Sequence, residues 1–245
     1  MREFFSICRN HDQFQIFSSL HIMVLVTIGV IISSMFIFRK SLRQRADFYR
    51  YLIVIISLVL EGLSLIWVVG AGRWDLKTSL PLELCEITFI LCIIMLIGKS
   101  YRLFEVAYFW GVTGSSLALI FPGLHLSYHH FPFWEFMLTH ALSIISIVFM
   151  ISVEKYKPTR KSIWVSFIIT NIYMVFMVTI NHFLGSNYYY QYIFNKSTLK
   201  ILSYLMNNNS LFFKILMLEG VSFIAILICY WPFTIVNIFK RKYTS

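Results

Sequence analysis

Seven apolar runs, each about as long as a bilayer is thick, follow one another along this chain of 245 residues. An α-helix needs about 20 residues to cross the roughly 30 Å of hydrocarbon in a membrane. Lipid offers no hydrogen-bond partner to an open backbone, so each run that crosses must be helical. The predicted spans are residues 17–38, 51–71, 80–98, 103–123, 133–153, 163–184 and 211–239. We therefore expect an all-α polytopic membrane protein, with seven transmembrane helices in one bundle and a single domain over residues 1–245.

The composition excludes several other classes of protein. Hydrophobic residues make up 58% of the chain, charged residues make up 13%, and the mean hydropathy is +0.74. Soluble domains are usually about 45–50% apolar and about 25% charged. An ordinary water-soluble enzyme, a disordered chain and a nucleic-acid binder with a polar surface are all excluded. The four cysteines form no C-x-x-C pair and predict no disulfide framework.

The basic residues are divided unevenly between the two sets of loops. Fourteen Lys and Arg residues fall within 39–50, 99–102 and 154–162 or after residue 239, whereas six fall on the opposite side. Basic residues collect in cytoplasmic loops, so this count predicts an outside N-terminus and a cytoplasmic C-terminus. The net charge of +10 therefore indicates orientation in a membrane and no nucleic-acid partner. We expect a multi-pass protein of the cell membrane.

Several polar side chains lie inside the predicted spans, where an ionisable group costs about 2.5–3.5 kcal/mol on insertion scales and is a functional candidate by default. At a rise of about 1.5 Å per residue, His21, Cys85 and His140 lie roughly 6–10 Å below the outer ends of their spans. This shared depth predicts a cavity that opens toward the outer leaflet. The candidate lining or orienting residues are His21, Glu83, Glu86, Asn181, His182 and Glu61.

Cys85 and His140 are the candidate catalytic pair. A thiol attacks an ester only as its thiolate, which needs a nearby base or a positive field. We expect Pro81 to start the third span, so that the helix dipole favours an anion at Cys85. His140 would be the base, and Glu83 or Glu86 would orient the imidazole. A cysteine in an apolar helix is more often a small core residue, and that interpretation stays open.

Residues 80–85, with the sequence LPLELC, resemble the L-P-L-H-L-C motif of the bacterial YwaF-like integral membrane family. Four shorter similarities, in the same order along the chain as in the family, lie at residues 17–21, 109–119, 136–140 and 181–188. That family is similar to the eukaryotic transmembrane protein 164 group, described as a cysteine-dependent acyltransferase that remodels ether phospholipids. By position, the resemblance implies that Cys85 is the nucleophile and His140 the base, whereas Glu83 replaces the family's usual histidine.

The sequence thus predicts acyl transfer or lipid ester hydrolysis at a cavity facing the outer leaflet. Acyl chains of membrane phospholipids or lipoproteins would be the partners, and no metal or organic cofactor is expected. Two alternatives remain open. The first is a proton- or cation-coupled transporter or solute-binding membrane protein, which would depend on the carboxylates Glu61 and Glu83 and not on Cys85. The second is a non-catalytic accessory subunit of a larger membrane complex.

Overall fold

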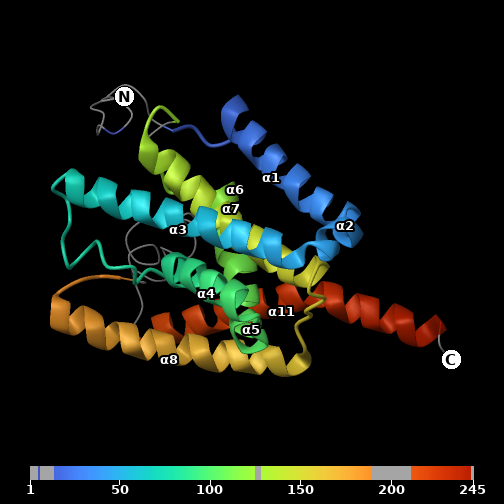
Figure 1. Ribbon diagram of the computed structural model, residues 1–245. Helices are drawn as coiled ribbons and strands as arrows, with labels where there is room; N and C mark the ends of the chain where they lie inside the picture. Colours follow the sequence, from blue (N-terminus) through green and yellow to red (C-terminus); the bar gives the residue numbers. More distant parts are fainter. Residues whose placement is uncertain (1–4, 6–13, 125–127, 189–210, 244–245) are drawn as a thin grey trace. The chain divides into compact units, whose positions relative to one another are not determined.

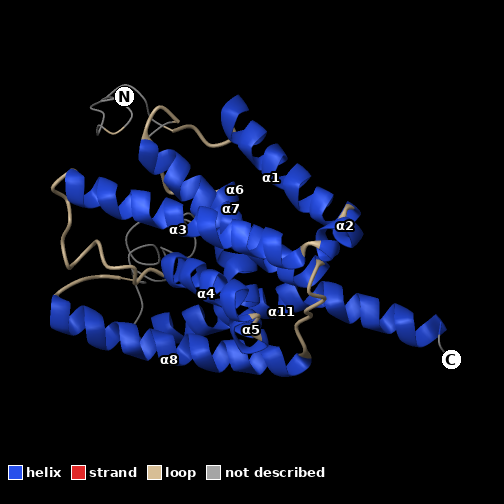
Figure 2. Ribbon diagram, viewed as in Figure 1, coloured by secondary structure: helices blue, strands red, loops and turns tan. Residues whose placement is uncertain are grey.

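The computed structural model describes residue 5 and residues 14–124, 128–188 and 211–243. These residues form helices and loops and contain no strand, which confirms the all-α prediction (Figures 1 and 2). The helices are α1 (Ser19–Ile37), α2 (Arg39–Gln44), α3 (Ala46–Gly70), α4 (Leu84–Gly98), α5 (Tyr101–Trp110), the π-helix η1 (Gly111–Ser115), α6 (Ser116–Ile120), α7 (Phe131–Ser152), α8 (Arg160–Leu184) and α11 (Leu211–Tyr243).

Five helical segments among the described residues are long and apolar enough to cross a membrane. They are α1, α3, the segment Tyr101–Ile120, α7 and α8. Two further apolar helices, α4 and Glu219–Ile235 within α11, are shorter than these five. The chain is therefore a multi-pass membrane protein, and the count of seven spans and the orientation of the termini stay predictions.

The structure differs from the predicted spans in the basic loop and in the fourth span. Residues 39–44, expected as loop, form α2, and α3 begins at Ala46 instead of residue 51. The fourth span is interrupted by η1, where the backbone changes to π-helical hydrogen bonding. A count of apolar residues cannot detect either feature, because polar residues form helices readily and a π-helix keeps the same side chains in the span.

The third span also begins later than predicted. Helix α4 starts at Leu84, so Pro81 lies in the preceding loop and does not open the helix. The loop backbone is held by side chains from α8 and the turn after it, because Tyr173 donates to the Leu82 carbonyl and Tyr188 donates to the Leu76 carbonyl. Because α4 begins at Leu84, Cys85 is the second residue of that helix.

The described contacts divide the chain into two compact units, Met1–Trp74 with Cys85–Tyr156, and Asp75–Leu84 with Lys157–Ser245. In the first unit α7 is the central helix, because 72% of its most apolar window is buried against 17% for α1 and α3. It packs against α1, α3, α5, η1 and α6. The ribbon in Figure 1 shows α3 and α7 side by side over part of their length. The single-domain prediction stays a prediction.

Basic side chains close one end of the first unit by binding the last carbonyls of two helices. Arg43 donates to the Val153 carbonyl at 2.9 Å, just past the end of α7. Arg50 is buried and donates to the Ile97 carbonyl at 2.9 Å, in the last turn of α4. Since both arginines come from the α2–α3 corner, α4 and α7 end on the same side and run in the same direction.

Lys99 adds an ion-pair cluster to this end. Its Nζ atom lies 3.0 Å from Asp47 Oδ1 and 3.3 Å from Glu154 Oε1. The hydrogen bond with Asp47, with a smaller contribution from Glu154, raises the pKa of Lys99. Asp47, Lys99 and Glu154 thus lie together. The charge count predicts that the segments carrying them share one side of the membrane. Four of the six basic residues predicted for the opposite face lie outside the described residues, namely Arg2, Arg9, Lys196 and Lys200.

The second unit consists of α8, α11 and the loop Asp75–Leu84. A capping box at Thr159 and Ser162 starts α8, and Gly185 ends it in the left-handed conformation at φ 60°. The Asn171 amide donates to Glu219 Oε2 at 3.0 Å, which links α8 to α11 inside the apolar part of both helices.

The π-helix approaches α7 most closely at Gly111. A Cβ atom at this position would lie 2.3 Å from Ile147 Cδ1 and 3.4 Å from Thr88 Cγ2. Ile147 is fully buried, and its Cδ1 atom would have to shift to admit that Cβ atom. Small residues allow helix backbones to come this close in membranes. Gly111 therefore sets the distance between η1, α4 and α7.

We expect Gly111→Ala to lower the free energy of unfolding by about 1–3 kcal/mol, the usual cost of overpacking a filled core. The measurement is the thermal transition of the purified protein in detergent. Gly114→Ala in the same π-helix is the control, because a Cβ atom there meets nothing within 4 Å. Equal transitions for the two variants would contradict the close approach.

Candidate functional site

Cys85 lies on one face of α4 together with Thr88 and Cys92. The spacing i, i+3, i+7 puts these three side chains in a single stripe. Thr88 and Cys92 are buried, whereas Cys85 is half-buried at the start of the helix. The first backbone N–H groups of a helix have no intrahelical acceptor and carry the positive end of its dipole. Cys85 is thus the cysteine of α4 whose thiolate the helix favours.

His140 lies on the equivalent stripe of α7, with Ser143 and Ile147 at the same spacing. The two stripes face each other, since the Cys92 thiol donates to the Ser143 carbonyl at 3.7 Å. Ile147 and Thr88 also both border Gly111. The fold therefore brings the helix faces that carry Cys85 and His140 together.

The helix rise gives the offset between the two candidates. Cys85 is seven residues before Cys92, or about 10 Å along α4, and His140 is three residues before Ser143, or about 4.5 Å along α7. Because the two helices run in the same direction, Cys85 lies roughly one helical turn further toward the helix starts than His140. In unliganded enzymes, catalytic contacts are often longer than in the substrate complex.

The hydrogen bonding of His140 determines which ring nitrogen carries the proton. Nδ1 lies 2.7 Å from the Phe136 carbonyl, and a carbonyl can only accept. In the neutral imidazole Nδ1 therefore carries the hydrogen, and Nε2 keeps a free lone pair. His140 is 5% exposed, and its Nε2 has no hydrogen-bond partner among the residues that the structure describes. This tautomer is the one that a general base requires. The thiol of Cys85 does not hydrogen-bond Nε2 here, so their pairing stays a prediction.

In contrast to His140, both ring nitrogens of His21 are bound to backbone groups. The Phe17 N–H donates to its Nδ1 at 3.0 Å, so Nε2 must carry the hydrogen, which it donates to the Leu119 carbonyl at 2.8 Å. The ring is fully buried. With both nitrogens bound to backbone, His21 joins the start of α1 to the end of α6 and has no lone pair left for catalysis.

Asn181 and His182 both belong to the second unit. The Asn181 amide donates to the Tyr188 carbonyl at 2.8 Å, and its Oδ1 accepts from the Tyr188 N–H at 2.9 Å and from the Ser186 hydroxyl at 2.9 Å. Asn181 thus closes the turn after α8. His182 is exposed, and its ring stacks edge-on with Phe183.

The three predicted carboxylates, Glu83, Glu86 and Glu61, differ in exposure and in the helix or loop that carries them. Glu83 is half-buried in the loop before α4, and Glu86 is exposed in the first turn of that helix. Glu61 is half-buried on α3 and interacts electrostatically with Glu135 on α7. Glu135 was missed in the sequence analysis, although its position in the fifth span would have made it a candidate by the same rule.

Tyrosine side chains of the second unit hold the loop that leads into Cys85. The Tyr188 hydroxyl donates to the Leu76 carbonyl at 2.8 Å and accepts from the Leu80 N–H at 2.9 Å. The Tyr173 hydroxyl donates to the Leu82 carbonyl at 2.6 Å. Together with Met174 and Met177, these rings form a small apolar cluster beneath the loop. The two tyrosines therefore hold the backbone of residues 76–82 within the second unit.

No group of three His, Cys, Asp or Glu side chains within the described ranges has the arrangement of a metal site. The candidate site consists of two side chains. They are the half-buried thiol of Cys85 at the start of α4 and the buried imidazole of His140 on α7, whose Nε2 is not bound by any described residue.

Comparison with protein families decides the relationship. Residues 16–236 match the TMEM164 family. The chain belongs to this family. The match covers every candidate residue from His21 to His182 and nearly the whole chain, so the similarity does not rest on one motif. Searches of curated proteins and of solved structures return no match.

In this TMEM164 family member, we expect Tyr188→Phe to loosen the loop before α4. The change removes the hydrogen bonds to the Leu80 N–H and the Leu76 carbonyl, each worth about 0.5–1.5 kcal/mol. We expect faster alkylation of Cys85 by a maleimide, by several-fold, in a protein whose other three cysteines are alanine. Tyr128→Phe, at an exposed tyrosine, is the control. An unchanged rate for Tyr188→Phe would show that this hydroxyl does not hold the loop.

Proposed function

We propose that this member of the TMEM164 family is a membrane-embedded enzyme that moves an acyl chain from a membrane lipid through Cys85. The observation that carries the proposal is the His140 tautomer. A buried imidazole with Nδ1 bound to a carbonyl and Nε2 free lies on the helix face opposite the stripe that carries Cys85. A histidine that only packed in the core would be expected to satisfy both nitrogens, as His21 does.

The proposed reaction begins when His140 Nε2 takes the proton of the Cys85 thiol. The thiolate attacks the carbonyl carbon of a lipid ester, the new C–S bond forms, and the C–O bond to the lipid alcohol breaks. His140 returns the proton to the departing alcohol oxygen. A second alcohol or water, deprotonated by the same nitrogen, then attacks the thioester and releases the thiol. The products are a transferred acyl chain or a free fatty acid.

The oxyanion of each step needs hydrogen-bond donors near Cys85. We infer that backbone N–H groups at the start of α4 are the donors, since Cys85 is the second residue of that helix and lies at the positive end of its dipole. The Asn181 side chain already donates an amide hydrogen to the Tyr188 carbonyl. We therefore assign the oxyanion to the start of α4.

Phospholipid acyl esters are the substrates that this site would meet most often, because the chain lies within the bilayer. The half-buried thiol is at the helix end, where ester carbonyls of a lipid lie between headgroup and tail. Acyl chains of lipoproteins have the same ester chemistry and are the alternative donor.

Replacement of the nucleophile tests the proposal. The protein, purified and reconstituted in vesicles with a phospholipid that carries a radiolabelled acyl chain, should form a labelled thioester that hydroxylamine releases. We expect Cys85→Ala to abolish this label and to lower acyl transfer at least a hundredfold. His140→Ala should slow formation of the thioester, because it removes the base and leaves the thiol.

Cys92→Ala is the matched control. Cys92 is fully buried on the same stripe and donates to a backbone carbonyl, so its loss should leave acyl transfer within about threefold. Acyl transfer that survives in Cys85→Ala would refute the mechanism. Loss of acyl transfer in Cys92→Ala but not in Cys85→Ala would show that the nucleophile is Cys92 and not Cys85.

One contact favours a second candidate function, cation-coupled transport. The carboxyl groups of Glu61 and Glu135 interact across α3 and α7, and the Thr139 hydroxyl contacts Glu135 Oε1 at 3.4 Å. Two neighbouring carboxylates within a bundle attract a cation, and such residues often mark ion pathways.

The two functions differ in their response to Glu61→Gln. If the chain is an enzyme, this change should leave acyl transfer within about threefold, and proteoliposomes should show no cation flux with either protein. If it is a transporter, the native protein should carry sodium or protons across the vesicle membrane, and Glu61→Gln should abolish that flux. A dye that reports internal pH, together with radioactive sodium, measures both.

A further inference from the structure

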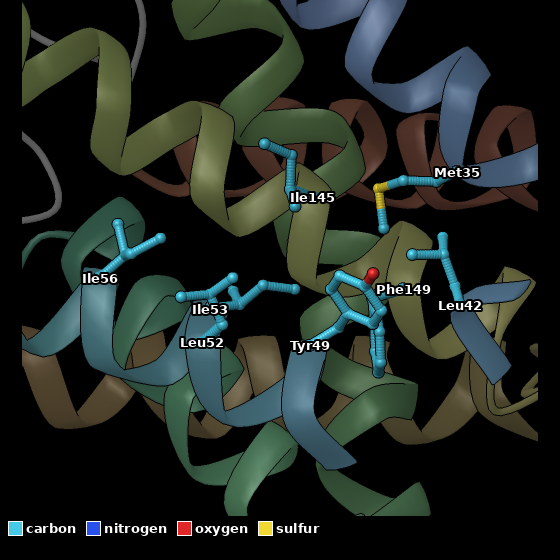
Figure 3. A pocket seen from close by; sticks show the side chains of 8 residues that line it. All are labelled: Met35, Leu42, Tyr49, Leu52, Ile53, Ile56, Ile145 and Phe149. Carbon is cyan, nitrogen blue, oxygen red and sulfur yellow. The ribbon is translucent and has the colours of Figure 1, made fainter. Parts of the chain in front are cut away.

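An apolar groove lies at the α2–α3 corner of the first unit, at the opposite end of α4 from Cys85. Its volume is about 160 Å³, and no polar atom contributes to its surface. Side chains from α1, α2, α3 and α7 converge on it (Figure 3). The lining residues are Met35, Leu42, Tyr49, Leu52, Ile53, Ile56, Ile145 and Phe149.

The groove follows α3 for two helical turns. On α3 the lining residues run from Tyr49 to Ile56, and seven residues at about 1.5 Å each span about 10 Å along that helix. Phe149 forms its buried floor, whereas Leu52 and Ile56 are exposed at its rim. It is therefore a narrow slot that opens sideways from the bundle, where lipid surrounds the helices.

The end of the groove at Tyr49 and Leu42 lies beside a cluster of basic side chains. Arg39, Lys40 and Arg45 are exposed and have no acidic partner among the described residues. The other two cations of this segment are occupied, because Arg43 binds the carbonyls at the end of α7 and Arg50 pairs with Asp47. Asp47 is also bound to Lys99, so the segment offers an uncompensated positive charge of three.

We propose that this groove binds one acyl chain of an anionic phospholipid from the leaflet on the α2 side, with the lipid phosphate held by Arg39, Lys40 and Arg45. An apolar slot within a bilayer is filled by hydrocarbon, because a void forfeits the dispersion contacts of its walls. Basic residues beside a transmembrane helix attract anionic headgroups, which here places phosphate and chain at the same end of the slot.

The dimensions argue against a protein occupant. A helix with its side chains is about 10–12 Å across, whereas the slot holds only about 160 Å³. A flexible acyl chain fits such a volume. The site is independent of the proposed function, since none of its residues belongs to the stripes of Cys85 and His140. By the predicted topology it faces the cytoplasmic leaflet, whereas Cys85 faces the outer one.

Photolabelling tests the proposal in the full chain reconstituted in vesicles. The probes are a phosphatidylglycerol and a phosphatidylcholine with the same acyl chains, each with a diazirine in one chain, and labelled peptides are mapped by mass spectrometry. We expect labels within residues 42–56 and 145–149, and at least fivefold more from phosphatidylglycerol than from phosphatidylcholine.

Two sets of variants separate the acyl slot from the headgroup site. Ile53→Trp fills the slot and should reduce labelling by both lipids at least fivefold, whereas Ile55→Trp, at a residue 58% exposed on the same helix, should not. Replacing Arg39, Lys40 and Arg45 by glutamine should reduce only the phosphatidylglycerol label. Glutamine at the exposed Arg102, Lys155 and Arg160 is the charge-matched control.

Three results would overturn the proposal. The first is an equal label from the two lipids in the native protein. The second is an equal effect of the tryptophan variants at residues 53 and 55. The third is a cross-link at the slot to a second copy of the chain. The glutamine variants change only exposed side chains, so they keep the test decisive if Ile53→Trp fails to fold.

Discussion

Helix ends in this protein are held by side chains that donate to open backbone carbonyls. Each helix leaves its last carbonyls without an intrahelical donor, and lipid offers none. Arg43 satisfies the end of α7, Arg50 the end of α4, and His21 the end of α6. A cation at the negative end of a helix dipole is also favourable. These contacts join elements far apart in the sequence, so the arrangement of the first unit depends on them.

The same requirement separates His21 from His140, which are both buried. Both lie in apolar helices and both bind a backbone carbonyl. His21 is also bound at its second nitrogen by a backbone N–H, whereas the Nε2 of His140 is left free. The two rings therefore differ by one hydrogen bond, and His21 links two helices through both of its nitrogens.

Much of the fold could be predicted from the apolar runs, because only helices can cross lipid and the length of a run gives the length of a span. The features that were missed depend on polar contacts between segments. Residues 39–44 form α2 where a basic loop was predicted, and α4 begins at Leu84, after a loop that Tyr173 and Tyr188 bind. The interaction of Glu61 with Glu135 needed the packing of α3 on α7, which no single run predicts.

The sequence by itself determined the membrane class, the helical fold and the residues with chemistry to offer, since hydropathy and residue type are local properties. Tertiary structure alone decided which of those residues are available. The loop tyrosines hold the backbone before α4, and Gly111 lets η1 approach α4 and α7 closely. Both results depend on groups tens of residues away, because a side chain's free hydrogen-bonding atoms are decided by the neighbours that folding brings to it.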